Sequence, residues 1–170
     1  MKKIVFIFGL IFTLMCGCGK QESSRISIEN GAFTCTPSFI VDQINLMVES
    51  SQNGVLLSLG EYTESGESIY ADDLGRLQVT MEADADGNLT NVRMYWDSGS
   101  NNENVITSAG AYSGVLLGIL NPDNADSISS SISEIISRGY GTVDFDENGV
   151  AVSFTSGDGL NWLEIGISDS

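Results

Sequence analysis

The stretch Leu77–Trp96, LQVTMEADADGNLTNVRMYW, decides the fold of this chain. Its first seven and its last five residues carry an apolar side chain at every second position, which is the period of a β-strand with one buried face. Between them, Asp84–Asn88 contains an Asp-Gly pair, which favours a tight turn between antiparallel strands. The stretch therefore predicts a β-hairpin with one apolar and one polar face.

Upstream of this hairpin, the sequence predicts two further strands and a helix. The apolar run Val55–Leu59 and the segment Ser68–Tyr70 have the length and the flanking turn residues of short strands. A helix is expected at about residues 37–51, because Thr36 can cap its first turn and Pro37 fits its first position. The apolar face of this helix is formed by Ile40, Ile44, Met47 and Val48.

Downstream, helical spacing returns twice. The first apolar stripe consists of Tyr112, Leu116, Ile119 and Leu120. The second consists of Ile128, Ile132, Ile135 and Ile136. We expect Asn121-Pro122 to end the first helix, and Asp126 or Ser127 to cap the second, which Gly139 ends. Two helices joined by a short turn predict an αα-hairpin.

The chain closes with three alternating segments. Their apolar residues are Val143 and Phe145, then Val150, Val152 and Phe154, and finally Leu163, Ile165 and Ile167. Turns are expected between them at Asn148-Gly149 and at Gly157–Gly159.

This order of elements predicts an α+β fold, an antiparallel sheet of hairpins with about three helices packed on one face. Residues 36–98 and 104–168 each run from helix into hairpins. Two similar α+β halves are therefore an open alternative, although no residue match between them supports a duplication.

Composition excludes several classes of function. The 170 residues include 23 Asp and Glu, 7 Lys and Arg and no His, and the net charge is −16. No nucleic-acid partner is expected, because phosphate binding needs clustered cations. Without His, a Ser-His or Cys-His nucleophile and a His-ligated metal are excluded, and no phosphate loop ending in Gly-Lys is present. We expect no catalytic or cofactor-binding residue and no cofactor.

The first 17 residues have the pattern of a secretory signal. Lys2 and Lys3 precede an apolar run, Ile4–Met15, that is too short to span a bilayer as a helix. The run ends in Leu14-Met15-Cys16-Gly17-Cys18, which resembles the lipobox of bacterial lipoproteins. The resemblance implies cleavage before Cys18, diacylglycerol on its thiol and a membrane partner bound through acyl chains. An ordinary signal peptide with a freely secreted product is the alternative.

These features predict three segments. Residues 1–17 are a lipoprotein signal peptide, residues 18–31 a lipidated polar tether, and residues 32–170 a single α+β domain. Loss of Lys2 and Lys3 with the signal peptide changes the net charge to −18. Cys35 is then the only thiol left for the domain, and we expect it to be a buried apolar residue.

Two acidic turns are weak candidates for metal binding. Asp144, Asp146 and Asn148 match the opening of a calcium loop, but Thr155 stands where the loop requires a Glu. The segment Glu82–Gly87 opens similarly, and Arg93 stands at its twelfth position. Both lie between alternating strands, so hairpin turns are the favoured interpretation. The adjacent pair Asp72-Asp73 is interpreted as a solvated loop.

Five aromatic residues are candidates for a binding face. A binding face could be lined by Tyr70, Tyr95, Trp96, Tyr140 and Trp162, although core packing is expected for most of them. Tyr95 is opposite in phase to Trp96, so we expect it to be exposed beside Arg93.

The sequence thus predicts a membrane-anchored lipoprotein on the extracytoplasmic side of a bacterial cell envelope, on the outer membrane where there are two. We expect a non-enzymatic binding or accessory module with a protein partner. The acidic charge is expected to give solubility and to repel the domain from an anionic membrane, and pairing with a basic partner is the alternative. The alternatives are an envelope-polymer hydrolase that uses Asp or Glu, and an acidic inhibitor or protective protein.

Overall fold

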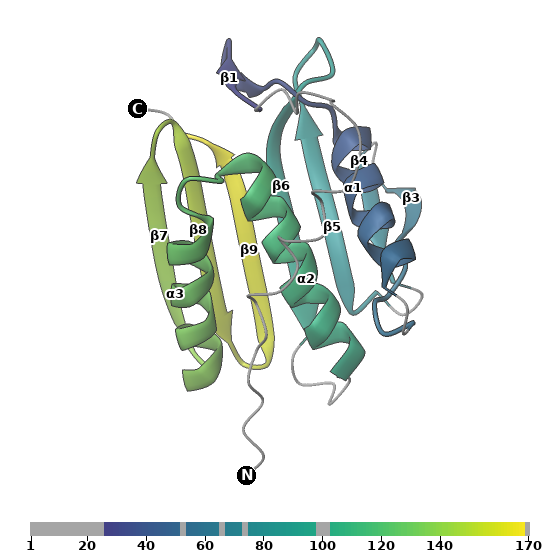
Figure 1. Cartoon of the computed structure of the whole chain (residues 1–170), viewed down its shortest axis with the longest axis vertical. Helices are drawn as coiled ribbons and strands as arrows, with labels where there is room; N and C mark the ends of the chain where they lie inside the picture. Colours follow the sequence, from purple (N-terminus) through teal and green to yellow (C-terminus); the bar gives the residue numbers. More distant parts are fainter. Residues whose placement is uncertain (1–25, 52–53, 65–66, 73–74, 98–102, 169–170) are drawn as a thin grey trace.

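Seven antiparallel strands form the main sheet (Figure 1). The computed structural model describes residues 26–51, 54–64, 67–72, 75–97 and 103–168. Across the sheet, the strands lie in the order β3, β4, β5, β6, β9, β8 and β7. Their bounds are β3 Gly60–Glu64, β4 Glu67–Ala71, β5 Leu77–Ala83, β6 Leu89–Asp97, β7 Gly141–Glu147, β8 Val150–Gly157 and β9 Leu160–Ile167.

The hairpin predicted at Leu77–Trp96 is confirmed as β5 and β6, with Leu77 opposite Trp96. The inward side chains of both strands are buried at alternate positions. The β7–β8 hairpin turns at Asn148-Gly149, with φ angles of 57° and 78°. Positive φ at both central residues is the type I′ geometry, whose twist matches that of the strands.

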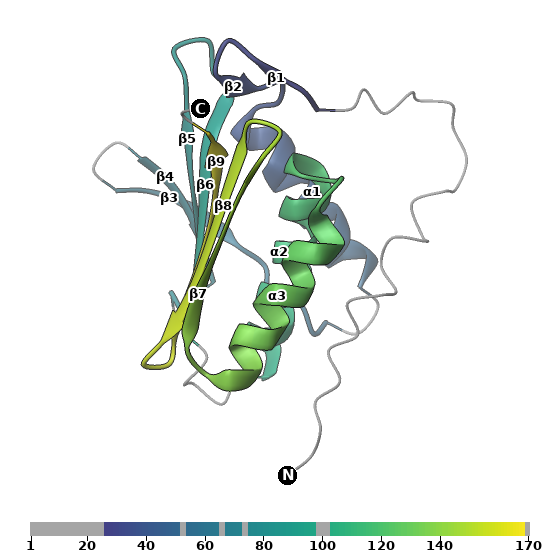
Figure 2. The same ribbon diagram turned by 90° about the vertical axis from the view of Figure 1, so that its left-hand side faces the viewer.

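Three helices cover one face of the sheet, as Figure 2 shows in side view. They are α1 Pro37–Ser50, α2 Glu103–Leu120 and α3 Ala125–Arg138. Thr36 caps α1 as predicted, because its Oγ1 accepts a hydrogen bond from the backbone N–H of Phe39 at 3.3 Å. The fold is therefore α+β, with helices packed on one side of an antiparallel sheet.

A small two-stranded hairpin precedes α1. It consists of β1 Ile28–Glu29 and β2 Ala32–Phe33. Its turn lies at Asn30-Gly31, so the hairpin straddles the boundary that the sequence suggests between tether and domain. Phe33 is 1% exposed and belongs to the core, and Ile28 packs against that core. The hairpin is thus attached to the main body.

One core joins both halves of the chain between the sheet and the helices. Its largest fully buried side chains include Tyr112, Phe33, Phe154, Ile40, Leu77 and Met94. Each half contributes a continuous block of strands, and the last strand of each, β6 and β9, pair at the junction. The first half contributes one helix and four strands, the second two helices and three strands.

The strand expected at Val55–Leu59 is wrong. This segment is irregular, and β3 begins only at Gly60. Side chains of α2 bind its backbone, because the N–H of Leu57 donates to Oγ of Ser108 at 2.8 Å and the hydroxyl of Tyr112 donates to its carbonyl. With these backbone groups paired to a helix, the segment does not need a neighbouring strand.

The cap expected for α3 is also wrong. The helix begins at Ala125, and Asn124 stands at the N-cap with no side-chain capping bond. Its amide instead donates to Oδ1 of Asn121 at 3.1 Å within the α2–α3 turn. Gly139 ends α3 in the left-handed conformation, with φ of 81°, as predicted.

Candidate functional site

One face of the main sheet has no helix packed on it (Figure 2), and we call it the open face. The strand register defines its side chains, because residues alternate between the two faces. In the five strands from β5 to β7 they are Gln78, Thr80, Glu82, Asn91, Arg93, Tyr95, Asp97, Thr142, Asp144, Asp146, Ala151, Ser153, Thr155, Leu160, Trp162 and Glu164, with Gly157 and Gly166 at two further positions. Apart from the aromatic Tyr95 and Trp162 and the aliphatic Ala151 and Leu160, these side chains are polar or charged.

The two aromatic residues lie opposite each other on β6 and β9. The ring centroids of Tyr95 and Trp162 are 6.0 Å apart at an interplanar angle of 70°, an edge-to-face contact. Trp162 is 47% exposed, and Leu160, two residues earlier on the same strand, is 46% exposed. We call Tyr95 and Trp162 the aromatic pair.

The neighbouring Trp96 shows the opposite environment. It is 3% exposed on the helix side and stacks on Phe154, with ring centroids 5.7 Å apart. Tyr95 is partly exposed and lies beside Arg93, which confirms its predicted phase. Of the other aromatic candidates, Tyr70 is buried and Tyr140, just before β7, is 73% exposed. Only two of the five aromatic residues therefore belong to the core, and the expectation that most of them do is wrong.

A charged cluster lies beside the aromatic pair. Arg93 bridges β5 and β9, with Nη1 2.8 Å from Oε1 of Glu82 and Nε 3.0 Å from Oε1 of Glu164. Nδ2 of Asn91 donates to the same Glu164 oxygen at 2.8 Å. Partial burial acts to raise the pKa of Glu164, but the bonds from Asn91 and Arg93 hold it below its ordinary value. The carboxylate of Glu164 is therefore ionised at neutral pH and is held in place by Asn91 and Arg93.

The metal candidates of β7 lie in a hairpin. Asp144 and Asp146 are exposed on the open face, and Asn148 is in the following turn. Oδ1 of Asp144 accepts a hydrogen bond from Oγ of Ser153 at 2.7 Å. Within the described ranges, no three acidic or cysteine side chains gather in a way that could hold a metal ion.

In the other acidic turn, between β5 and β6, the carboxylate of Asp84 binds backbone N–H groups of the turn itself. Oδ1 of Asp84 accepts the N–H groups of Asp86 at 2.9 Å and Asn88 at 2.8 Å. Hydrogen bonding, led by the N–H of Asn88, lowers the pKa of Asp84. This carboxylate thus shapes the turn.

The interpretation of Asp72 as part of a solvated loop is wrong. Asp72 is 6% exposed, and its carboxylate accepts the backbone N–H groups of Arg76 and Leu77 as well as the Arg76 guanidinium. Burial acts to raise its pKa, but these hydrogen bonds and the Arg76 charge hold it below the ordinary value. The tight bend between β4 and β5 brings these donors together, which residue spacing does not reveal.

Two further features of the interior are a buried thiol and a small crevice. Cys35 is 8% exposed, and burial raises the pKa of its thiol to about 11, so the expectation of a buried apolar residue is confirmed. A small crevice between α1 and the sheet is lined by Val41, Ile44, Asn45, Leu59, Tyr70, Val79 and Met81. This lining offers one amide and one phenol and no charged group.

The proposed lipidation residue, Cys18, lies outside the described residues, as does the rest of the signal peptide. In the part of the chain that the structure covers, no helix has the length and apolar character needed to cross a membrane. Among the described residues, the open face is the candidate functional site. The alternation of side chains along the sequence predicts that Tyr95 is exposed, but it does not predict the contact between Tyr95 and Trp162.

Comparison with known proteins provides no relative. No protein-family model, no curated protein and no solved structure matches the chain.

Proposed function

We propose that this protein is a lipid-anchored binding module on the extracytoplasmic side of a bacterial envelope, and that it engages a basic protein partner through its open face. The signal sequence and the lipobox-like Leu14–Cys18 support the location. Tethering would raise the local concentration of the module at the membrane, so that a moderate affinity suffices.

The half-exposed indole of Trp162 is the observation that carries the binding role. A large aromatic side chain at 47% exposure, on a face without helices, has apolar area still to bury. Its edge contact with Tyr95 restricts its orientation, so less side-chain entropy is lost on binding. Trp and Tyr are the residues most enriched at binding hot spots.

Charge indicates the nature of the partner. Among the described strand residues from β5 to β7, the open face carries the carboxylates of Glu82, Asp97, Asp144, Asp146 and Glu164 against the guanidinium of Arg93. Arg93 is already paired with two of these carboxylates. An Arg-rich or Lys-rich contact surface would complement the excess negative charge, and a guanidinium can also stack on an indole.

The hydrolase alternative requires a carboxyl group that stays protonated near neutral pH. The structure lowers the pKa values of Asp72, Asp84 and Glu164, so these three cannot serve as that acid.

An acidic inhibitor would use the same open face as a binding module, and the identity of the captured partner distinguishes the two.

Binding is tested by comparing two exposed aromatic residues on opposite faces. Immobilised wild type, Trp162→Ala and Phe39→Ala proteins are incubated with detergent extract of the envelope. Phe39 is 39% exposed on α1, on the helix side, so Phe39→Ala is the matched control. We expect one basic protein to be retained by wild type and by Phe39→Ala, lost with Trp162→Ala, and released by salt. Equal retention by all three proteins would contradict the role of the open face.

The anchor has its own test. Mass spectrometry of the native protein should find an N-terminal Cys18 carrying a diacylglycerol, and Cys18→Ser should abolish the modification. An unmodified sulfur at this position would reject the lipid anchor and leave the binding test unaffected.

A further inference from the structure

We infer that β7 is the edge at which a partner protein adds an extended strand, and that the side chains of this strand alternate between cationic and apolar. The inference rests on the basic partner of the proposed function and specifies how that partner is held. It depends on the backbone of β7 rather than on the aromatic pair, so the two can be tested apart.

The outer edge of β7 has no neighbouring strand among the described residues. β7 is the last strand in the order of the sheet and pairs with β8 alone. In Figure 2 it is on the near side of the molecule, and none of the described helices and strands lies over its outer edge. The seven residues of β7 contain no proline, and their pairing with β8 has no bulge, although both devices commonly protect an exposed edge from further pairing. β7 therefore offers a straight edge about 24 Å long.

The turn between β7 and β8 determines which backbone groups face this edge. A two-residue type I′ turn is closed by a hydrogen-bonded pair, here Glu147 and Val150, and such pairs alternate along the ladder with non-hydrogen-bonded pairs. The N–H and C=O groups of Thr142, Asp144 and Asp146 therefore point away from β8. No other described residue binds these backbone groups. They are thus available to an added strand, which gains its affinity from such main-chain hydrogen bonds.

The helix side of the same edge has apolar surface still to bury. Val143 and Phe145 pack against the core but remain partly exposed. Their cross-strand neighbours on β8, Phe154 and Val152, are 0% and 1% exposed. The difference arises because β8 has a strand on each side, whereas β7 has one. Apolar side chains of an added strand, opposite Val143 and Phe145, would complete this burial.

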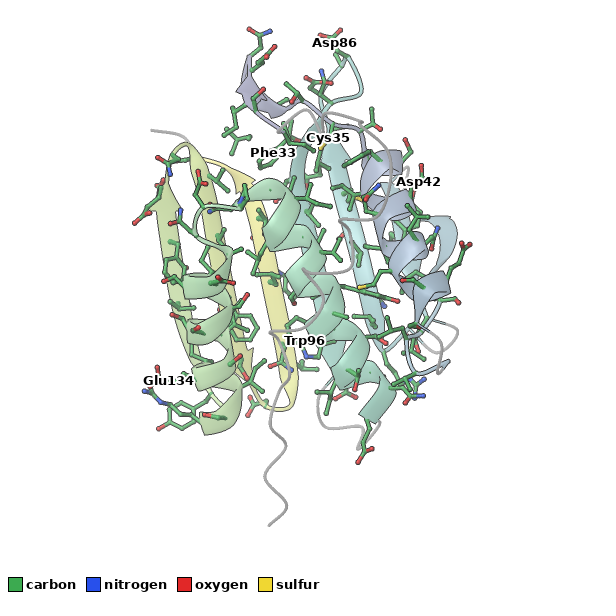
Figure 3. The ribbon with its side chains drawn as sticks, in the orientation of Figure 1. Phe33, Cys35, Asp42, Asp86, Trp96 and Glu134 are labelled. Atoms are coloured by element: carbon green, nitrogen blue, oxygen red, sulfur yellow. The ribbon has the colours of Figure 1, made fainter. Side chains whose placement is uncertain are left out.

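The open-face side of the edge carries negative charge. Asp144 and Asp146 are exposed there, and Oδ1 of Asp144 accepts a hydrogen bond from the neutral hydroxyl of Ser153. Figure 3 shows Glu134 on α3, on the β7 side of the molecule, where it pairs with Arg138. The guanidinium of Arg138, the nearest cation in sequence, is therefore matched by a carboxylate of its own helix. Lysine or arginine opposite Asp144 and Asp146 would form favourable cross-strand pairs.

The same charges disfavour a second copy of this chain as the occupant. In the antiparallel register that overlaps all of β7, Asp144 would lie directly opposite the same residue of the other copy. Like charges opposite each other destabilise a strand pair, whereas opposite charges stabilise it. Asp144 and Asp146 thus protect the edge against self-association and leave it open to a cationic strand.

Binding of a synthetic strand tests the inference. The probe is a dye-labelled peptide of seven residues in which lysine and valine alternate. Fluorescence anisotropy measures its dissociation constant with the full-length protein in detergent. The controls are a peptide with glutamate in place of lysine and a peptide in which the lysines and the valines are grouped. We expect the alternating cationic peptide alone to bind, more weakly as salt is added. No binding by this peptide, or equal binding by all three, would overturn the inference.

Two substitutions at one position separate the backbone from the charge. Asp144→Ala removes the carboxylate and keeps the outward N–H, whereas Asp144→Pro removes both. Proline is tolerated in an edge strand where the N–H faces outward, so the circular dichroism spectrum should be unchanged. We expect Asp144→Ala to weaken peptide binding several-fold and Asp144→Pro to weaken it by about a further tenfold. Equal affinity of the two variants would contradict strand addition.

A second pair of variants is available if Asp144→Pro does not fold. The N–H of Thr142 also faces outward, so Thr142→Pro removes a donor without changing the charge. Thr142→Ala is its matched control, because both substitutions remove the hydroxyl that contacts Thr155. Weaker peptide binding by Thr142→Pro than by Thr142→Ala is expected, and equal binding would again contradict strand addition.

The envelope extract distinguishes this inference from the proposed function. We expect the basic partner to be lost with Asp144→Pro as well as with Trp162→Ala. Retention by Asp144→Pro would reject strand addition, and loss with Trp162→Ala in the same experiment would leave the proposed function intact. Loss with Asp144→Pro and retention by Trp162→Ala would reject the role of the aromatic pair and support strand addition. A wild-type dimer that Asp144→Pro dissociates, measured by analytical ultracentrifugation, would assign the edge to a second copy and overturn the inference.

Discussion

At the scale of single residues, neighbours in sequence have opposite roles in this protein. Trp96 is core and Tyr95 is surface because a strand alternates its side chains, and the phase is visible in the sequence. Asp72 is different, because its burial depends on a bend that brings Arg76 and Leu77 back to its carboxylate. No periodicity signals this arrangement, and the sequence interpretation as a solvated loop failed there.

Asp72→Asn should destabilise the fold in a pH-dependent way. The pKa of Asp72 is lowered in the folded protein, so its ionised form stabilises the fold above the ordinary pKa of an aspartate. This stabilisation is lost as the pH falls through the lowered value. Urea unfolding at pH 7 should show a loss of about 1–3 kcal/mol in the free energy of unfolding. The difference from wild type should shrink in acid. Asp86→Asn, at an exposed residue, is the control, and a pH-independent difference for Asp72→Asn would contradict this account.

At the scale of elements, backbone conformation decides where glycine is needed. Gly139 ends α3 with φ of 81°, a conformation that costs a side chain energy, whereas Gly114 lies inside α2. A Cβ at either position would meet nothing within 4 Å. The two glycines therefore differ in backbone conformation, while no neighbouring group excludes a side chain at either position.

The two alanine substitutions should accordingly have opposite signs. Gly139→Ala should lower the free energy of unfolding by about 1 kcal/mol, because alanine resists the left-handed conformation. Gly114→Ala should raise it by about 0.5–1 kcal/mol, because glycine weakens a helix interior. Thermal and urea denaturation of both variants measure the pair, and the same sign for both would reject the explanation.

At the scale of the whole molecule, the halves meet along β6 and β9 in one sheet. Seven residue pairs join these strands, from Asn91 opposite Gly166 to Asp97 opposite Leu160. The helices α1 and α2 also pack over a core that contains residues from both halves. Neither half can therefore bury its apolar face by itself.

Unfolding should consequently be a single cooperative transition. Far-ultraviolet circular dichroism and tryptophan fluorescence should give coincident urea curves, and the calorimetric and van't Hoff enthalpies should agree. Residues 36–98 expressed alone should not fold, because β6 would lose its partner β9 and expose its buried face. Two resolved transitions would indicate independent halves instead.

The sequence by itself determined the α+β class, most strands and helix ends, the opposite phases of Tyr95 and Trp96, and the buried state of Cys35. These depend on local periodicity, caps and turns, which act over a few residues. Only the tertiary structure decided the pairing of β6 with β9, and with it the contact between Tyr95 and Trp162. It also decided that Leu57 binds side chains of α2 instead of joining a strand, and that Asp72 is buried. The physical reason is the same in each case: a partner distant along the chain satisfies the group, and spacing within one segment contains no information about that partner.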